Sequence, residues 1–237
     1  MERITNSGFR NHSGNDRAGL TLLEVLVAVL IFAVAMTTIY GSFNAVMGDV
    51  SIIEKKRNLY EMGKTCMDRM ISDFKSLHVV LPPMYEEPGF DDDPDPFRFV
   101  GENVFGPGDG FSKVGFTAAA HLPLSNDARK GIARIVYYVQ QTEDGGFVLR
   151  RSDTLFPFGP EEENPHDPVL CEHMRSFELR FYDEAGEAYE SWDSDSGEFE
   201  YSTPRGIGIH FTLGDESGEA AFSTRVNLPV FREKKGS

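Results

Sequence analysis

Apolar positions are concentrated near the N-terminus of the chain. Residues 25–36 are apolar without interruption, and the run extends over 20–43 if Glu24 and a few Thr and Tyr residues are included. A helix of about 20 such residues crosses the roughly 30 Å of hydrocarbon in a bilayer. The pattern therefore predicts a membrane-spanning helix over 20–43, with a carboxylate near its start.

A second apolar pattern follows the predicted span. Its residues recur at steps of three and four, the spacing of an amphipathic helix. The stripe consists of Leu59, Met62, Cys66, Met70, Phe74 and Leu77. Because Pro82 and Pro83 follow and proline interrupts a helix, we expect the helix to continue over 44–81 and to end near Val80.

The remaining residues, 82–237, have the pattern of a β-rich domain. Residues 82–131 are rich in Pro, Gly and Asp and predict an irregular connection with short strands at 97–100 and 113–118. Later segments alternate apolar and polar residues around turn sequences such as TEDGG and GDESGE, which is typical of antiparallel hairpins. These strands are 132–141, 146–154, 176–183, 206–213 and 221–230. The predicted fold class is α+β, with a long N-terminal helix packed on antiparallel sheets.

Charge is distributed unevenly along the chain. The net charge is −15; residues 1–19 carry a net charge of +1, and the residues beyond Gly19 carry −16. Such an acidic domain repels phosphate backbones, so we expect no nucleic-acid partner. Arg10 and Arg17 precede the span, and the positive-inside bias places the N-terminus in the cytoplasm and the residues after about 45 outside it. The basic cluster Lys55, Lys56 and Arg57 runs against this assignment.

The order of residues around the span argues against an ordinary signal peptide. A signal peptide has its small-residue cleavage site after the apolar run, whereas Arg17-Ala18-Gly19 precedes it here. A cut after Gly19 would leave the apolar segment as the new N-terminus. We also expect Glu24 to have a functional role or a partner, because inserting a carboxylate at the bilayer centre costs roughly 2.5–3.5 kcal/mol of free energy on insertion scales.

The stretch GLTLLEVLVAVLIF, residues 19–32, is similar to the cleavage and methylation motif of type IV prepilins. The resemblance implies that a prepilin peptidase removes the leader 1–19 after Gly19 and that Leu20 is then N-methylated. Leu20 departs from the Phe or Met that is commoner in the family. Glu24 matches the family's glutamate, and its carboxylate could neutralise the Leu20 ammonium of its own or an adjacent subunit during assembly.

The second half of the chain resembles one subfamily more specifically, the J-type minor pseudopilins of type II secretion. The similar segments are RIVYYV, GFVLRR, SFELRFYDEAGE and TPRGIGIHFTL, with a Trp before the last. The resemblance implies a pilin-like fold and a structural subunit without catalysis or cofactor, at the tip of a periplasmic pseudopilus that drives protein export. Its implied partners are the prepilin peptidase, the I-type and K-type minor pseudopilins and the major pseudopilin. It also implies a single-pass inner-membrane protein with a periplasmic domain over 82–237. Residues 82–115 match no part of this pattern.

Several assignments stay open at this point. Cys66 and Cys171 form either a disulfide or a pair of buried thiols. Asp193 and Asp195 offer alternating oxygen ligands for calcium, or belong to a solvated acidic loop. Trp192 is either a core residue or an anchor for a partner. Two other functions are a minor pilin of a type IV pilus, acting in adhesion or DNA uptake, and a periplasmic enzyme tethered by the span.

Overall fold

The computed structural model describes residues 21–89, 92–104, 110–122, 130–159, 163–216 and 218–234, and only the backbone of residues 45–52. The chain divides into two compact units, Met1–Ser51 and Ile52–Ser237. The second unit is the head. The predicted leader 1–19 and Leu20 lie outside the described residues.

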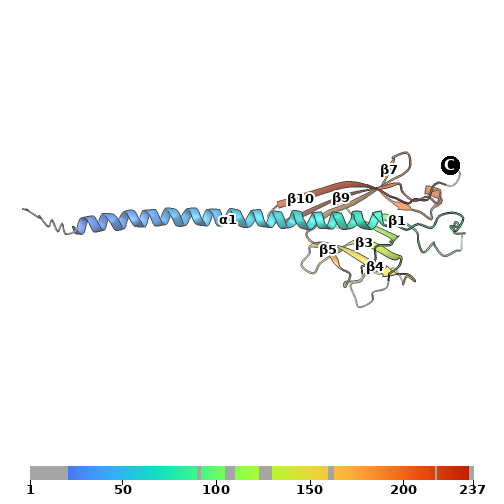
Figure 1. Cartoon of the computed structure of the whole chain (residues 1–237), viewed down its shortest axis with the longest axis horizontal. Helices are drawn as coiled ribbons and strands as arrows, with labels where there is room; N and C mark the ends of the chain where they lie inside the picture. The colour runs from blue at the N-terminus through green and yellow to red at the C-terminus, as the bar shows by residue number, and fades with distance from the viewer. Residues whose placement is uncertain are drawn as a thin grey trace, which may run out of the picture. The chain divides into compact units, whose positions relative to one another are not determined.

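Helix α1 spans Leu22–Lys75 and carries the predicted membrane segment in its first part (Figure 1). Within the described residues, Leu22–Asn44 is a stretch of 23 residues that is long and apolar enough to cross a membrane. Every side chain in it is exposed in the isolated chain. Exposed Leu, Val, Ile and Phe side chains in such numbers require an apolar surrounding, which a bilayer or packed neighbouring helices would supply.

The amphipathic stripe of α1 is confirmed in the head. Cys66, Met70 and Phe74 have no exposed surface, and Leu59 is 4% exposed. The helix ends at Lys75, however, so the expected end near Val80 is wrong. Beyond Lys75 the backbone bonds instead to the end of strand β2 (Phe111–Ala118) and the residue after it. The Ala119 amide donates to the Ser76 carbonyl at 2.9 Å, and the His78 amide donates to the Thr117 carbonyl at 2.8 Å.

The strands of the head form a single sheet with the order β10-β9-β6-β2-β3-β4-β5. Short strands β1 and β8 pair with each other, β1 pairs with β2, and β7 pairs with β6. The strands are β1 (Val100–Val104), β2 (Phe111–Ala118), β3 (Ala133–Gln141), β4 (Phe147–Leu155), β5 (Val169–Cys171), β6 (Met174–Tyr182), β7 (Ala188–Tyr189), β8 (Trp192–Asp193), β9 (Gly206–Asp215) and β10 (Gly218–Asn227). The sheet curves around the second part of α1, the part that belongs to the head, which we call the helix of the head. Strands β9 and β10 lie on one side of it and β3 to β5 on the other (Figure 1).

The sheet is antiparallel as predicted, with one exception. Strands β2 and β6 pair in parallel through Phe111 and Phe177. The strand predicted at 97–100 is also wrong, because β1 begins only at Val100. Before it, the Phe97 amide donates to the Asp95 side chain at 2.9 Å, so the local side chain competes with a strand ladder.

The core of the head lies between the helix and the concave face of the sheet. Phe74 of α1 packs on Phe116 and Tyr137, with ring centroids 4.8 Å and 6.2 Å away. At Gly63 the helix lies very close to strand β10, because a Cβ atom at this position would lie 2.3 Å from the Phe222 ring. Each fully buried large side chain contributes about 1.5–3 kcal/mol, so this interface holds the helix against the sheet.

Candidate functional site

The start of α1 is built around Thr21 and Glu24. The Thr21 hydroxyl accepts a hydrogen bond from the Glu24 amide at 3.3 Å, and the Thr21 carbonyl accepts from the Val25 amide at 3.2 Å. This is the spacing of an N-terminal cap, with Thr before the helix and Glu in its first turn. The Glu24 carboxylate also lies at the positive end of the helix dipole. Gly19 and Leu20, the predicted cleavage and methylation site, lie outside the described residues.

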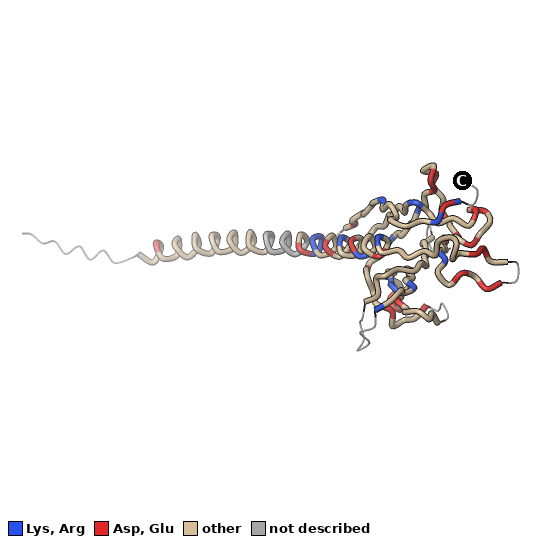
Figure 2. Tube along the Cα trace, turned by 45° about the vertical axis from the view of Figure 1, so that its right-hand side comes forward, with Lys and Arg blue, Asp and Glu red and all other residues tan. Residues whose placement is uncertain are grey.

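Glu24 is the one Asp, Glu, Lys or Arg residue of the segment Leu22–Asn44. Figure 2 accordingly shows one acidic position, coloured red, near the start of the helix. The two threonine hydroxyls of this segment are hydrogen-bonded within the helix. Thr37 donates to the Ala33 carbonyl at 2.7 Å, and Thr38 donates to the Ala35 carbonyl at 2.8 Å. Hydroxyls bonded in this way add little free-energy cost in lipid. The costly group of the span is therefore the Glu24 carboxylate, whose charge has to be neutralised in an apolar surrounding.

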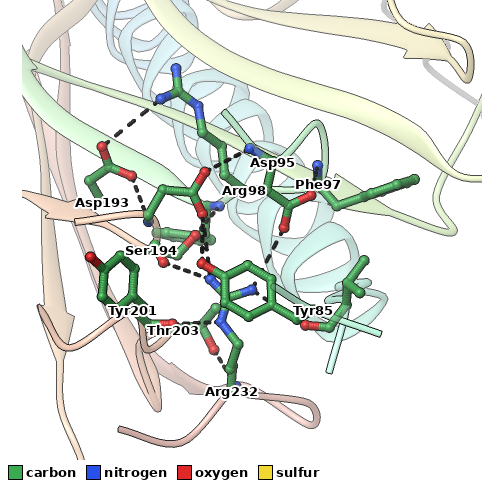
Figure 3. Close-up of polar contacts among 12 residues, drawn as sticks. Tyr85, Asp95, Phe97, Arg98, Asp193, Ser194, Tyr201, Thr203 and Arg232 are labelled. Atoms are coloured by element: carbon green, nitrogen blue, oxygen red, sulfur yellow. Dashed lines mark hydrogen bonds and ion pairs between the residues drawn. The ribbon is translucent and has the colours of Figure 1, made fainter. Parts of the chain in front are cut away.

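Two acidic loops, far apart in the sequence, meet in the head (Figure 3). The Asp195 carboxylate accepts hydrogen bonds from the Asp95 amide at 2.8 Å and from the Tyr85 hydroxyl at 3.2 Å. Both carboxylates face the Arg232 guanidinium, Asp95 at 3.7 Å and Asp195 at 3.6 Å. The loops therefore converge on one cation from the C-terminal segment.

Arg232 is only 3% exposed at its side chain and bonds in several directions. Its guanidinium donates to the Tyr201 carbonyl at 2.5 Å and to the Ser194 carbonyl at 2.6 Å, and it lies 3.2 Å from the centroid of the Tyr85 ring. Burial lowers the pKa of Arg232, and Tyr85 and the two carboxylates counteract the shift. We call these residues, Arg232, Asp95, Asp195, Tyr85, Ser194 and Tyr201, the Arg232 cluster. The cluster connects the C-terminal segment to both acidic loops.

The calcium candidates Asp193 and Asp195 have protein cations beside them. Asp193 lies 4.0 Å from Arg98, and Asp195 is bound in the Arg232 cluster. Burial raises the pKa of Asp195. Over the ranges that the structure describes, no three His, Cys, Asp or Glu side chains come together as metal ligands. A calcium ion at these aspartates would have to compete with Arg98 and Arg232.

Trp192 belongs to the core and does not form an exposed anchor. It is 1% exposed, and its ring stacks on Phe199 with centroids 4.3 Å apart. The indole N–H donates to the Ser202 carbonyl at 2.9 Å. The core alternative for this residue is therefore confirmed.

Cys66 and Cys171 are both buried and both present as free thiols. They belong to the same core cluster, one on α1 and the other on β5. A hydrogen bond with Cys171, together with burial, raises the pKa of the Cys66 thiol. The structure thus has the thiol alternative, and a disulfide between the two stays a prediction.

A buried ionic network ties α1 to the sheet, and the sequence analysis did not identify it. The Asp73 carboxylate accepts from the Arg151 Nε at 2.6 Å and from the Tyr137 hydroxyl at 2.5 Å, and it pairs with Arg69 at 2.6 Å. Asp73 has no exposed surface. Burial raises the pKa of the Tyr137 hydroxyl, and the Asp73 carboxylate adds to the rise.

The network continues from Arg151 toward the surface. Arg151 donates to Asp153 at 2.7 Å, and Asp153 contacts the His121 ring at 2.7 Å and accepts from the Leu122 amide at 2.8 Å. Arg69 and Arg151 both donate to the carbonyl of Ala120, at 2.9 Å and 3.0 Å. The network therefore joins the helix, strand β4 and the loop after β2.

A long apolar helix with a single early glutamate, followed by a β-sheet curved around the helix's second part, defines the pilin-like class of proteins. A family model described as "Prokaryotic N-terminal methylation motif" matches residues 14–40. A second, "Type II secretion system (T2SS), protein J", matches residues 42–219. The chain belongs to this protein J family, the J-type minor pseudopilins. Among curated proteins, none matches the chain.

Proposed function

We propose that this chain is processed after Gly19 and assembles into the tip of a periplasmic pseudopilus that drives protein export. The family match, which continues from the helix into the head, is the observation that carries the proposal. It favours secretion over a type IV pilus and a structural role over a tethered enzyme. The I-type and K-type minor pseudopilins and the major pseudopilin are the proposed neighbours.

The proposed mechanism is assembly through α1. Processing would place the Leu20 ammonium just before the helix, about one turn from the Glu24 carboxylate. The Thr21 cap supports this reading, because it fixes the first turn on which Glu24 lies. The ammonium and a carboxylate of the same or an adjacent subunit would then neutralise each other in an apolar surrounding.

The location follows from the same features. The apolar segment would hold the chain in the inner membrane until it is extracted, with the short N-terminus in the cytoplasm and the head in the periplasm. The arginines before the span and the acidic head after it support this orientation.

Processing is tested by co-expressing the chain with a prepilin peptidase and determining the mature N-terminus by mass spectrometry. The expected product begins at methylated Leu20. A retained Met1, or a cut beyond residue 40, would overturn the proposal.

Assembly is tested with Glu24→Gln, which removes the charge and keeps the shape. We expect normal processing but loss of co-purification with the other pseudopilins. The matched control is Glu54→Gln, an exposed acid of the same helix outside the apolar segment. Equal co-purification of both variants would contradict a role of Glu24 in assembly.

A further inference from the structure

The sheet of the head ends on one side in strand β10, which has ten residues. Strand β9 pairs with it in one antiparallel register over its whole length. The other end of the sheet is strand β5, which has three residues, and its pairing with β4 shifts in register between Leu149 and Arg150. Proteins shorten or bulge their edge strands because an exposed edge can pair with another chain. This chain protects the β5 edge in that way and leaves the β10 edge long and regular.

The residues that form the free edge of β10 follow from its pairing with β9. The Leu228 amide donates to the Arg205 carbonyl at 2.9 Å and continues the β9–β10 register. Because hydrogen-bonded residues alternate along an antiparallel strand, the even-numbered residues of β10 bond to β9. The odd-numbered residues turn their N–H and C=O groups outward, and no hydrogen bond within the described part of the chain reaches these groups. They are Glu219, Ala221, Ser223, Arg225 and Asn227.

An exposed aromatic ring lies beside this edge, on the side of the sheet that faces the helix. Tyr60 of the helix is 60% exposed, and its ring centroid lies 5.4 Å from that of Phe222, which is itself only partly buried. A strand added to β10 would place alternate side chains on this side, where apolar ones would cover both rings. On the opposite side, the exposed Glu219, Ser223 and Arg225 suit polar side chains. The complementary segment is therefore an extended strand that alternates apolar and polar residues.

We propose that the β10 edge is the docking site for such a strand of a neighbouring pseudopilin subunit of another type. The inference rests on the proposed assembly function. In this kind of recognition, main-chain hydrogen bonds provide the affinity, and the alternate side chains of the added strand provide the specificity. The free edge of β10 supplies the first, and the uncovered Tyr60 beside Phe222 supplies the second.

A second copy of this chain does not offer a suitable strand. Two copies that pair through the same edge form a closed two-fold contact, whereas a filament grows through contacts between different surfaces. Strand β10 also runs in the direction of the helix of the head, because Gly218 lies next to Lys56 and Phe222 next to Gly63. An antiparallel pair of β10 strands would therefore point the two helices in opposite directions. The other edge of the sheet offers only β5, whose three residues cannot match the ten of β10.

The test is site-specific photo-crosslinking of the full-length protein in cells that produce the other pseudopilins and an exported substrate. A photoreactive phenylalanine in place of Ser223 is expected to cross-link to another pseudopilin, identified by mass spectrometry. The matched control position is Glu178 of β6, because His210 of β9 pairs with both Ser223 and Glu178 in one row of the sheet. Glu178 is exposed but lies two strands from the edge, about 10 Å away.

Two results of this experiment would overturn the proposal. One is a cross-link from Ser223 to the exported protein or to a second copy of this chain. The other is a yield from Ser223 that is no higher than the yield from Glu178.

A second measurement tests the main-chain contact. Ala221→Pro removes an outward N–H, so the β9–β10 ladder loses no hydrogen bond. The cross-link yield from Ser223 should fall about tenfold, the upper end of the effect of one lost hydrogen bond. Ala221→Ser keeps the N–H and should leave the yield unchanged. Thermal unfolding checks that both variants are folded, and equal yields from the two folded variants would contradict strand addition.

A third variant tests the apolar side of the docking site. Tyr60→Ala should lower the cross-link yield about fivefold, the effect of losing an aromatic contact that contributes about 1 kcal/mol. The control is Met84→Ala, which removes a side chain that is 85% exposed on the loop after α1. An equal yield from these two variants would contradict a strand that covers Tyr60.

The mature N-terminus and co-purification are determined on the same samples. Correct processing and co-purification without the cross-link from Ser223 would overturn the docking site and leave the assembly function intact. An unprocessed chain without the cross-link would overturn both.

Discussion

The Asp73 carboxylate of α1 accepts from the Arg151 Nε of β4 at 2.6 Å, and neither side chain is more than 3% exposed. Removing one partner of a buried ion pair leaves the other charge uncompensated. We therefore expect Asp73→Ala to lower the free energy of unfolding by about 3–5 kcal/mol. Urea unfolding of the purified protein in detergent, followed by the fluorescence of Trp192, measures the loss.

The control for this prediction is Glu61→Ala. Glu61 pairs with Arg57 at 3.7 Å on the same helix, but both side chains are 66% exposed. Exposed pairs contribute at most about 1 kcal/mol. If Asp73→Ala and Glu61→Ala cost the same, Asp73 does not join the helix to the sheet energetically.

Gly63→Ala should destabilise the head, although alanine normally favours a helix over glycine by about 1 kcal/mol. The added Cβ would lie 2.3 Å from the Phe222 ring, which is too close without a shift of the helix, of β10 or of the ring itself. Thermal unfolding should therefore move to lower temperature. The change Phe222→Ala in the Gly63→Ala background should recover part of the loss through a non-additive coupling.

Gly41→Ala is the matched control, because nothing lies within 4 Å of a Cβ at that helical glycine. We expect it to leave the unfolding of the head unchanged. A stabilised Gly63→Ala protein would show that Phe222 moves away without cost.

Periodicity predicted the elements of the head well because each buries one regular face. The stripe on α1 and the alternation of Phe177, Leu179 and Phe181 on β6 are both found as predicted. Periodicity fails where other hydrogen bonds take up the backbone. The Phe97 amide donates to the Asp95 side chain within the predicted strand 97–100, and beyond Lys75 the backbone bonds to residues 117–119.

The polar clusters were harder to predict because their members are distant in the sequence. Asp73 did give a signal, since it follows Met70 by three residues and lies on the apolar stripe, where an acid needs a partner. Nothing in the sequence identified Arg151 as that partner. Arg232 gave no signal, because only the fold brings the C-terminal segment to the two acidic loops.

The thiols of Cys66 and Cys171 should be unreactive in the folded protein. The thiolate is the nucleophile in alkylation and in disulfide exchange, and a hydrogen bond with Cys171 and burial raise the pKa of Cys66. We expect no iodoacetamide adduct in the native protein and two adducts after unfolding without reductant. Mass spectrometry counts the adducts. Adducts that appear only after reduction would instead identify a disulfide between Cys66 and Cys171.

Acid should weaken the network at Asp153. Burial alone would raise the pKa of this carboxyl, but the Leu122 amide and the Arg151 and His121 side chains outweigh it and lower the pKa below its usual value. Folding therefore favours the ionised form. The resulting stabilisation is fully present above the unfolded pKa of about 3.9 and is lost as the pH falls through the lower folded pKa.

This pH dependence is measured by urea unfolding of the wild type and of Asp153→Asn between about pH 6 and pH 2. The variant lacks the titrating group, so the stability difference between the two proteins should be largest above about pH 4 and should shrink as Asp153 is protonated in the folded wild type. Since Asn keeps the size of the side chain, packing changes little. A difference that stays constant over the whole range would mean that the ionised carboxylate contributes nothing to holding the loop after β2 on β4.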